Sequence, residues 1–273
     1  GSYKEFAADS EMDIVYIASP HSHHMEHTLM CLENGKSLVC EKAFAINGKE
    51  VGAMIEYARK KKLFLMEALW PPFQPYYQYA KGIIEKGLVG DILTVRSYFA
   101  FKPPYEPQKR LFNSELGGGV LLDIGIYPVI DALRFLGKPD KIDIAASFDR
   151  SGVDSDIDIL FSYSNGRTAS LYSSFNSGIG VGTDLVCEGG IISLRRKSDG
   201  SQLCRLKMYE GIIEKEIFSP DAQGYQFEAI EAMKCMDAGK TESDVVPLSF
   251  SKDLIDTLDK IRLKAGIIYP GHD

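Results

Sequence analysis

The stretch from Met12 to Phe44 constrains the fold more than any other part of the chain. Its first apolar run, Asp13 to Ala18, is rich in β-branched residues and is typical of a strand buried on both faces of a parallel sheet. Apolar residues then recur at helical spacing as far as Asn34-Gly35, which is a stop signal for a helix. Ser37 to Cys40 is a second buried run. We therefore predict a βαβ unit with parallel strands.

Polar residues follow both of these strands at their carboxyl ends. In an open parallel sheet, ligands bind in the crevice beyond these ends. A lysine delivered into such a cleft can have its pKa tuned for proton transfer. On position alone, Lys42 is equally well explained as a surface lysine paired with Glu41. The residues in question are Ser19, Pro20, His21 and His24 after the first strand, and Glu41, Lys42, Ala43 and Phe44 after the second.

Composition excludes several classes of partner. The 273 residues suit one large or two modest domains, and a net charge of -7 argues against nucleic acid or an anionic membrane as the main partner. No apolar run approaches the length that spans a bilayer. The five cysteines are scattered without C-x-x-C spacing, which is typical of reduced intracellular thiols rather than a disulfide frame or zinc site. We therefore expect a cytoplasmic protein.

The α/β pattern continues for one more helix and one more strand. Asn47 to Lys62 has an apolar face and a basic end that suits the helix dipole. Leu63 to Leu69 is another apolar strand. The alternation ends at Trp70-Pro71-Pro72, so we predict a first domain of residues 1–70 and a second of residues 71–273.

The second domain has a different pattern, with long strands after a helix at Tyr76 to Lys86. Several of these strands alternate in polarity, which indicates an antiparallel or mixed sheet with one covered face. Helices at Gln226 to Ala238 and Ser249 to Lys264 close the chain. The expected strands are Ile92 to Phe101, Lys141 to Phe148, Ile157 to Tyr163, Thr168 to Phe175, Thr183 to Cys187, Ile191 to Arg196, Leu203 to Tyr209 and Ile212 to Phe218.

A second candidate site lies between Leu116 and Gly137. Three glycines, Gly117 to Gly119, precede an apolar helical pattern and would free the backbone N–H groups of a helix start to approach a ligand. Asp123 and Tyr127 are four residues apart and would share one helix face, with Asp131 one turn further. A proline within this pattern, Pro128, would kink the helix or delay its start.

Tyr127 and Asp123 have side chains that can take part in acid–base chemistry. A phenol can pass a proton, and a neighbouring carboxylate can orient it or a substrate hydroxyl. If the Lys42 cation lies close to Tyr127 over a shared pocket, as we expect, it would lower the Tyr127 pKa. The spacing alone is explained as well by an Asp favoured at a helix start and a half-buried Tyr over the core.

The histidines do not form a metal site in the sequence. His24 and His27 could face one way on a helix, but no Cys or cluster of carboxylates completes a ligand set beside His21 and His23. No metal is predicted. A G-x-S-x-G elbow and a P-loop are also absent from the printed sequence, so hydrolase and kinase readings lack a nucleophile or a phosphate cradle.

Taken together, these motifs resemble the glucose-fructose oxidoreductase and inositol dehydrogenase family, Gfo/Idh/MocA. The similarity extends over nearly the whole chain and is greatest to the dihydrodiol and xylose dehydrogenase branch. It rests on Y-I-A-S-P-H-S-H-H from Tyr16, G-K-S-L-V-C-E-K ending at Lys42, E-A-L-W ending at Trp70, G-G-G-V-L-L-D-I-G-I-Y ending at Tyr127, and I-R-L-K-A-G-I-I-Y-P ending at Pro270.

The resemblance implies an NAD(P)-dependent oxidoreductase with a Rossmann domain and a C-terminal α/β domain whose open sheet makes a homodimer or higher oligomer. The expected fold is therefore α/β, with a truncated Rossmann-type parallel sheet followed by an α+β domain containing a large, mostly antiparallel open sheet. It places the catalytic positions of the family on Lys42, Asp123 and Tyr127. It places cofactor contacts on Ser19, Pro20, His21, His24, Glu41, Lys42 and Trp70.

The chain departs from the family pattern at three places. Ala43 stands where the family has a proline and would loosen the loop that holds Lys42. Pro71-Pro72 stands where the branch tends to have Thr-Arg, which removes a candidate cation. No G-x-G-x-x-G turn precedes Asp13 in the printed sequence.

The sequence therefore predicts hydride transfer between NAD or NADP and the carbinol carbon of a sugar, polyol or cyclic diol. Tyr127 would exchange the hydroxyl proton, Lys42 would bind the same oxygen, and Asp123 would fix the substrate or Tyr127, with the roles of Lys42 and Tyr127 open to exchange. One alternative is a regulatory protein that binds a sugar or dinucleotide without turnover. Another is an inactive remnant of the same fold.

Overall fold

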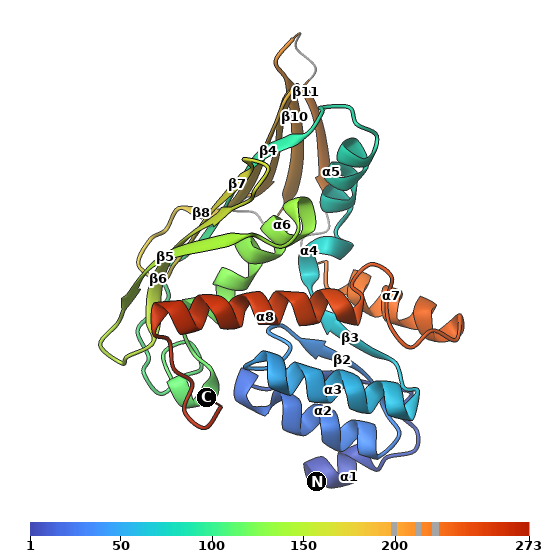
Figure 1. Ribbon diagram of the computed structural model, residues 1–273. Helices are drawn as coiled ribbons and strands as arrows, with labels where there is room; N and C mark the ends of the chain where they lie inside the picture. Colours follow the sequence, from blue (N-terminus) through green and yellow to red (C-terminus); the bar gives the residue numbers. More distant parts are fainter. Residues whose placement is uncertain (198–200, 211–213, 220–223, 273) are drawn as a thin grey trace.

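The structure is a computed structural model that describes residues 1–197, 201–210, 214–219 and 224–272. It contains two sheets: a parallel sheet with strand order β1-β2-β3, and an eight-stranded sheet with order β11-β10-β9-β8-β4-β7-β6-β5. Figure 1 shows the small sheet with its helices below the large sheet. The predicted α/β fold class, with a parallel sheet followed by a larger and mostly antiparallel one, is confirmed.

The small sheet has the predicted βαβ connections. β1 (Ile14–Ile17) pairs in parallel with β2 (Ser37–Glu41), and β2 pairs in parallel with β3 (Leu65–Ala68). A short 3-10 turn (His21–His23) and α2 (His24–Glu33) connect the first two strands, and α3 (Gly48–Lys61) connects the next two. A short helix that the sequence did not predict, α1 (Tyr3–Ala7), precedes β1.

Parallel pairing brings the ends of the three strands to one edge. Ile17 pairs with Cys40, and Glu41 pairs with Ala68. The residues that follow each strand are therefore neighbours in space although they are far apart in sequence. The loops that begin at Ala18, Lys42 and Leu69 form this edge.

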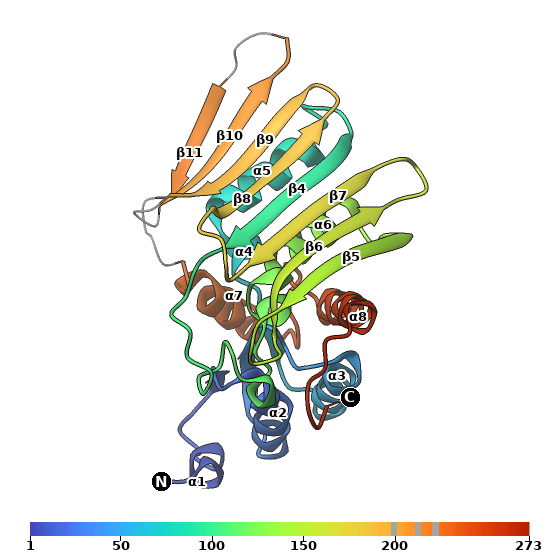
Figure 2. The ribbon, with the colours of Figure 1, turned by 90° about the vertical axis from the view of Figure 1, so that its left-hand side faces the viewer.

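The large sheet is antiparallel except between β4 and β7, which run parallel. Figure 2 shows its strands side by side with helices behind them. The first two residues of the expected strand Ile212–Phe218 lie outside the described residues. The strands are β4 (Ile92–Ala100), β5 (Lys141–Phe148), β6 (Asp154–Ser162), β7 (Thr168–Ser174), β8 (Gly180–Cys187), β9 (Gly190–Arg196), β10 (Gln202–Met208) and β11 (Glu214–Ser219).

Helices cover one face of the large sheet. α5 (Pro75–Glu85) packs on β9 and β10, and α6 (Ile126–Leu136) packs on β4 and β7. A single π-helical turn, Leu121–Gly125, leads into α6, and Pro128 is the third residue of α6. The proline therefore falls near a helix start, where its missing N–H costs little. Two further short elements, α4 (Trp70–Phe73) and a 3-10 turn (Ser114–Leu116), were not predicted.

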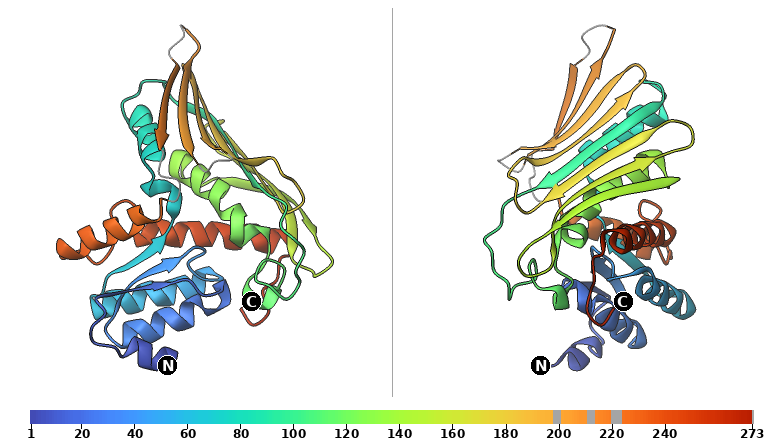
Figure 3. Two further views of the ribbon diagram at one scale, coloured as in Figure 1. Left: turned by 180° about the vertical axis from the view of Figure 1, so that it is seen from behind. Right: turned by 60° about the vertical axis from the view of Figure 1, so that its left-hand side comes forward.

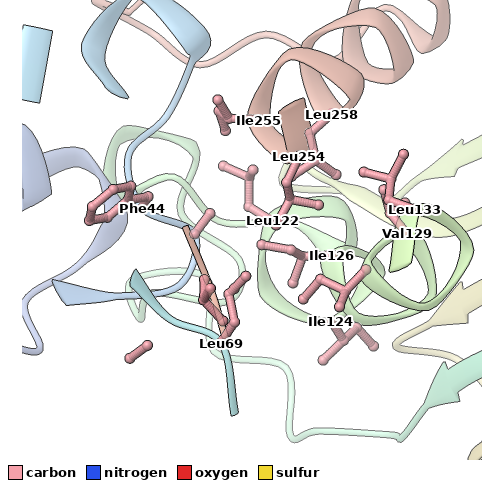
Figure 4. Packing of buried hydrophobic residues seen from close by; sticks show 14 of the residues in the cluster. Phe44, Leu69, Leu122, Ile124, Ile126, Val129, Leu133, Leu254, Ile255 and Leu258 are labelled. Carbon is pink, nitrogen blue, oxygen red and sulfur yellow. The ribbon is translucent and has the colours of Figure 1, made fainter. Parts of the chain in front are cut away.

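The C-terminal helix joins the two sheets into one body. α7 (Gln226–Asp237) lies beside α4, and α8 (Leu248–Ala265) contacts α3 and β3 on one side and α6 and β5 on the other. Figure 3 shows α8 running between the sheets. Figure 4 shows Leu254, Ile255 and Leu258 of α8 near the buried Leu122, Ile126 and Leu133. The hydrophobic core is therefore continuous across both parts of the chain.

One segment passes a length and composition test for crossing a membrane, contrary to the expectation from sequence that no run would. This segment, Ser114–Leu136, is 89% buried inside the structure in its most apolar window. It contains α6, the central helix under the large sheet, so its apolarity is explained by packing. All five cysteines are free and buried.

Replacement of a leucine of α8 tests the role of this helix in joining the two sheets. Leu258 is 1% exposed, so Leu258→Ala should lower the free energy of unfolding by about 2–5 kcal/mol through lost contacts and a cavity. Leu263, 69% exposed on the same helix, provides the control, and Leu263→Ala should change stability by less than about 0.5 kcal/mol. Urea denaturation measures both, and equal effects would contradict the described packing.

Candidate active site

A cavity of about 1000 Å³ lies between the two parts of the fold. One wall is the edge where the strands of the small sheet end. The other walls come from α5, α6, α7 and strands β4, β8 and β9 of the large sheet. Ser19, Pro20, His21, Glu41, Lys42 and Trp70 line it from the first part, and Asp123, Tyr127 and Asp131 line it from the second.

Lys42 connects the two parts directly. It follows β2, and its Nζ donates hydrogen bonds to the backbone oxygen of Asp123 and to Asp123 Oδ1, the latter at 3.4 Å. The side chains are only 13% and 6% exposed. A buried ion pair of this kind is costly to leave with one partner missing. The contact therefore fixes the end of β2 against the π-helical turn.

A second cation holds Asp123 in its ionised form. Arg110 donates from Nη1 to Asp123 Oδ1 at 2.6 Å. Burial by itself would raise the pKa of Asp123, but the cations of Lys42 and Arg110 outweigh it and hold this pKa at about 2. Asp123 is thus a carboxylate at neutral pH, with a lysine and an arginine arranged around it.

Tyr127 lies next to Lys42, as expected. The lysine Nζ is 5.1 Å from the centroid of the phenol ring, over its face. Burial, followed by the negative charges of Glu41 and Asp123, raises the pKa of Tyr127 well above its ordinary value. The prediction that Lys42 would lower this pKa is therefore wrong for the structure described, because desolvation and nearby carboxylates favour the neutral phenol.

Three buried side chains contact the loop that carries Lys42. His24 lies between the oxygens of Ser19 and Ala43, 2.8 Å from each, and Glu67 Oε1 accepts the N–H of Phe44 at 3.0 Å. His21 approaches the oxygen of Lys42 at 3.2 Å. The Lys42–Ala43 peptide bond is cis. Each of these contacts ties the loop to a buried side chain, which opposes the loosening expected from Ala43.

The buried groups around this loop have shifted pKa values. Burial, helped by the Lys42 charge, lowers the pKa of His21 to about 4, and burial lowers the pKa of His24. Burial raises the pKa of Glu67 to about 8. His24 is fully buried and does not line the cavity, so it supports the loop from behind rather than reaching a ligand from its ring.

The three glycines before α6 do not present their N–H groups to the cavity. Gly118 and Gly119 donate to the backbone oxygens of Asn113 and Leu111, and Asp154 Oδ2 accepts the N–H of Leu121 at 2.6 Å. Gly119 has a φ of +119° and packs against Asp154 so closely that a Cβ there would overlap the carboxylate. The predicted use of these glycines for ligand binding is wrong, because a buried carboxylate already occupies the helix start.

Glu228 lines the cavity and was missed by sequence reasoning, as was its contact with Tyr16. Tyr16 donates to Glu41 Oε1 at 2.6 Å and lies 3.4 Å from Glu228 Oε2. Burial and the charge of Glu41 raise the pKa of Glu228 to about 8. Glu228 is on α7, far along the chain from Tyr16. No sequence motif includes Glu228. The one signal in the sequence that could have identified it is a carboxylate on the buried face of a helix.

Asp131 contributes a polar wall on the side of the large sheet. Its Oδ2 accepts from Ser97 at 2.8 Å and from Thr183 at 2.5 Å. Burial raises its pKa to about 6 although both hydroxyls oppose this shift. The expected alignment of Asp123, Tyr127 and Asp131 is confirmed, since all three line the cavity. Within the described residues, no group of three or more His, Cys, Asp or Glu side chains could hold a metal ion.

Comparison with known proteins agrees with this geometry. Residues 1–69 match the model of an oxidoreductase family with an NAD-binding Rossmann fold. The protein is therefore an NAD(P)-dependent oxidoreductase by class. Residues 77–193 match the Gfo/Idh/MocA C-terminal domain. The chain is 33% identical over 278 residues to trans-1,2-dihydrobenzene-1,2-diol dehydrogenase of Xenopus laevis, covering 99% of this chain and 83% of the relative. It belongs to the Gfo/Idh/MocA family.

Other relatives and solved structures extend the comparison. The human trans-1,2-dihydrobenzene-1,2-diol dehydrogenase is 31% identical over 281 residues, covering 99% of this chain and 82% of the relative. Aldose-aldose oxidoreductase of Caulobacter crescentus with glycerol has a TM-score of 0.84 at 23% identity, over 97% of this chain and 80% of that one. Levoglucosan dehydrogenase with NADH and levoglucosan has a TM-score of 0.83 at 20% identity, over 97% and 81%. These structures share the fold.

The buried Asp154 predicts how stability depends on pH. Burial raises its pKa from 3.8 to about 7. The folded protein keeps a proton that the unfolded chain loses, so the free energy of unfolding falls as pH rises from about 4 to about 7. Asp154→Asn retains the oxygen that accepts from Leu121 and cannot ionise, so this fall should be smaller in the variant.

Urea denaturation at about pH 5 and about pH 8 measures the effect. Asp143→Asn, at an exposed position on β5, is the control and should follow the parent protein. An identical pH dependence in Asp154→Asn and the parent would show that Asp154 is ionised in the folded protein at both pH values.

Proposed function

We propose that this protein transfers a hydride between a nicotinamide dinucleotide and the carbinol carbon of a sugar, polyol or cyclic diol. The observation that carries the proposal is the contact of Lys42 with both Asp123 and the Tyr127 ring at the wall of one cavity. These are the groups needed to bind a hydroxyl or carbonyl oxygen and to move its proton. The substrates named for relatives, a diol and several sugars, fall within this class.

The residues at the strand ends fit a nicotinamide cofactor, which when bound supplies or accepts the hydride. Ser19, Pro20 and His21 line the cavity from the end of β1, and Glu41 and Lys42 line it from the end of β2. Trp70, which follows β3, offers a flat apolar surface for an aromatic ring. The position beyond the carboxyl ends of parallel strands is the general ligand site of such sheets. We assign cofactor contacts to these residues and a supporting role to His24.

The protonation states suggest roles for the catalytic residues. Tyr127 is a neutral phenol because burial and nearby carboxylates raise its pKa, so it donates a proton or hydrogen bond to a substrate oxygen. Lys42 provides a positive charge beside this oxygen and stabilises negative charge as it develops. Asp123, which also pairs with Arg110, holds Lys42 in place. Alcohol oxidation is the reverse of this step and requires Tyr127 to start as the phenolate, which takes the hydroxyl proton.

A regulatory protein that binds ligand without turnover is the second candidate. Such a protein has no need to bring a lysine to a partly buried phenol beside an ionised carboxylate. It would show a change in cofactor fluorescence on adding sugar with no change in redox state. An inactive remnant would bind neither cofactor nor sugar.

We further propose that the protein forms a homodimer through the open face of the large sheet. Figure 2 shows this face without a helix in front of it, and Leu160 of β6 is 43% exposed there. Sedimentation at micromolar concentration should give about twice the chain mass of 30.3 kDa. Leu160→Arg should shift the protein toward the monomer, and a monomeric parent protein would contradict the proposal.

Substitution of the lysine and the tyrosine tests the reaction. Lys42→Ala and Tyr127→Phe should each lower the turnover number by about 100-fold or more, because each removes a group needed for proton transfer. Cofactor affinity should change far less. The assay follows nicotinamide absorbance with a panel of sugars, polyols and diols.

The chain offers a matched control on its surface. Lys61 lies over the ring of Tyr57 in α3, with 5.7 Å from Nζ to the centroid. Lys61→Ala and Tyr57→Phe make the same chemical changes away from the cavity and should leave turnover unchanged. Full activity in both Lys42→Ala and Tyr127→Phe would rule out the assigned roles.

A further inference from the structure

The basic side chains that line the cavity are not all neutralised. Lys42 and Arg110 both pair with Asp123, and Arg195 pairs with Asp184 at 2.6 Å. Arg196 also lines the cavity. It forms no ion pair with any carboxylate in the part of the chain that the structure describes. Of the lysine and arginine residues on these walls, it is therefore the one whose charge is available to a ligand.

Arg196 has a defined position where the large sheet approaches the small one. It is the last residue of β9, on the inward side that Ile192 and Leu194 also occupy. Its guanidinium lies 5.8 Å from the centroid of the Trp70 ring. Trp70 is the second residue after the end of β3, so this contact is at the same edge as Lys42. An arginine over an indole face is partly ordered before a ligand arrives.

The other charges of the cavity act differently on an anion. Glu41, Asp123 and Glu228 line it from β2, the π-helical turn and α7. Glu41 and Asp123 repel a negative group near Lys42 and Tyr127, whereas Arg196 attracts one on β9. Glu228, whose pKa is raised to about 8, adds little negative charge at neutral pH. A negatively charged substrate would therefore bind with its anionic end at Arg196 and its carbinol end at the lysine and tyrosine.

We propose that Arg196 binds an anionic group of the substrate, and that the substrate is a sugar or polyol carrying a carboxylate, such as an aldonate or a uronate. The anion site at Arg196 does not depend on the proposed function. Only the placement of the carbinol at Lys42 and Tyr127 rests on that function. A single guanidinium matches the two oxygens of a carboxylate. A phosphate group has more oxygens and a higher charge than one arginine satisfies.

The single tryptophan of the chain provides the test. Because Trp70 is the only tryptophan and Arg196 lies over it, its fluorescence reports binding at this place. Titration of the full chain with glucuronate and with glucose, in low salt, should show glucuronate binding at least about tenfold more tightly, as expected for one charge-assisted contact. This preference should decrease in high salt, since Arg196 is exposed.

Two variants separate Arg196 from a general effect of surface charge. Arg196→Gln should abolish the preference for glucuronate and leave glucose binding unchanged. Arg205 is exposed on β10, on the opposite face of the sheet, because Cys204 is the residue that pairs with the inward Leu194. Arg205→Gln should keep the preference. Equal affinity for the two sugars in the parent protein, or a preference that survives Arg196→Gln, would overturn the proposal.

A third ligand tests the choice of carboxylate. Glucose 6-phosphate should bind more weakly than glucuronate, and tighter binding of the phosphate would overturn the carboxylate assignment. The titration also separates this proposal from the catalytic one. Lys42→Ala should keep the preference for glucuronate while it loses turnover. A protein that transfers no hydride yet retains an Arg196-dependent preference would contradict the proposed function and leave the anion site standing.

Discussion

The contact between Lys42 and Asp123 is the interaction on which the site depends. It joins a loop of the small sheet to a helical turn of the second part, 81 residues further along the chain. Two buried charges attract each other enough to offset their lost hydration only when further hydrogen bonds satisfy them. Arg110 and the backbone oxygen of Asp123 provide these bonds. The position of Tyr127, one helical turn after Asp123, follows from this contact because both residues belong to one continuous helical segment.

The buried carboxyl groups around the cavity differ in protonation state because their surroundings differ. Asp123 has two cations beside it and a pKa of about 2, whereas Glu67 contacts no cation among the described residues and has a pKa of about 8. Asp154 lies between these extremes, at about 7. The ionised group faces the cavity, and the other two hold backbone N–H groups of the segments that carry Lys42 and Asp123. Burial and neighbouring charge therefore decide which carboxyl group is ionised at the cavity and which ones support the backbone.

Much of this arrangement could be predicted from the sequence, because the patterns that indicate it lie within single segments of the chain. Short apolar runs and helical spacing identify β1, β2, α3 and α8, and parallel pairing then requires Ser19 and Lys42 to lie at one edge. The contacts that were missed join residues without a shared pattern. Asp154 supports a helix start from another strand, Glu228 approaches Tyr16 from α7, and Arg196 reaches Trp70 from β9. Such partners depend on the packing of whole elements, which no single segment encodes.

The placement of α8 has a consequence for folding during synthesis. The helix that completes the core of β3 and α3 is synthesised long after these two elements. Until then the N-terminal strands have an incomplete apolar cover and must remain soluble while about 200 residues are added, a delay of tens of seconds at ordinary rates of synthesis. Contacts between the ends of a chain also slow folding, because the intervening loop must be ordered first. The segment from β1 to β3 is therefore exposed to chaperones until α8 has been made.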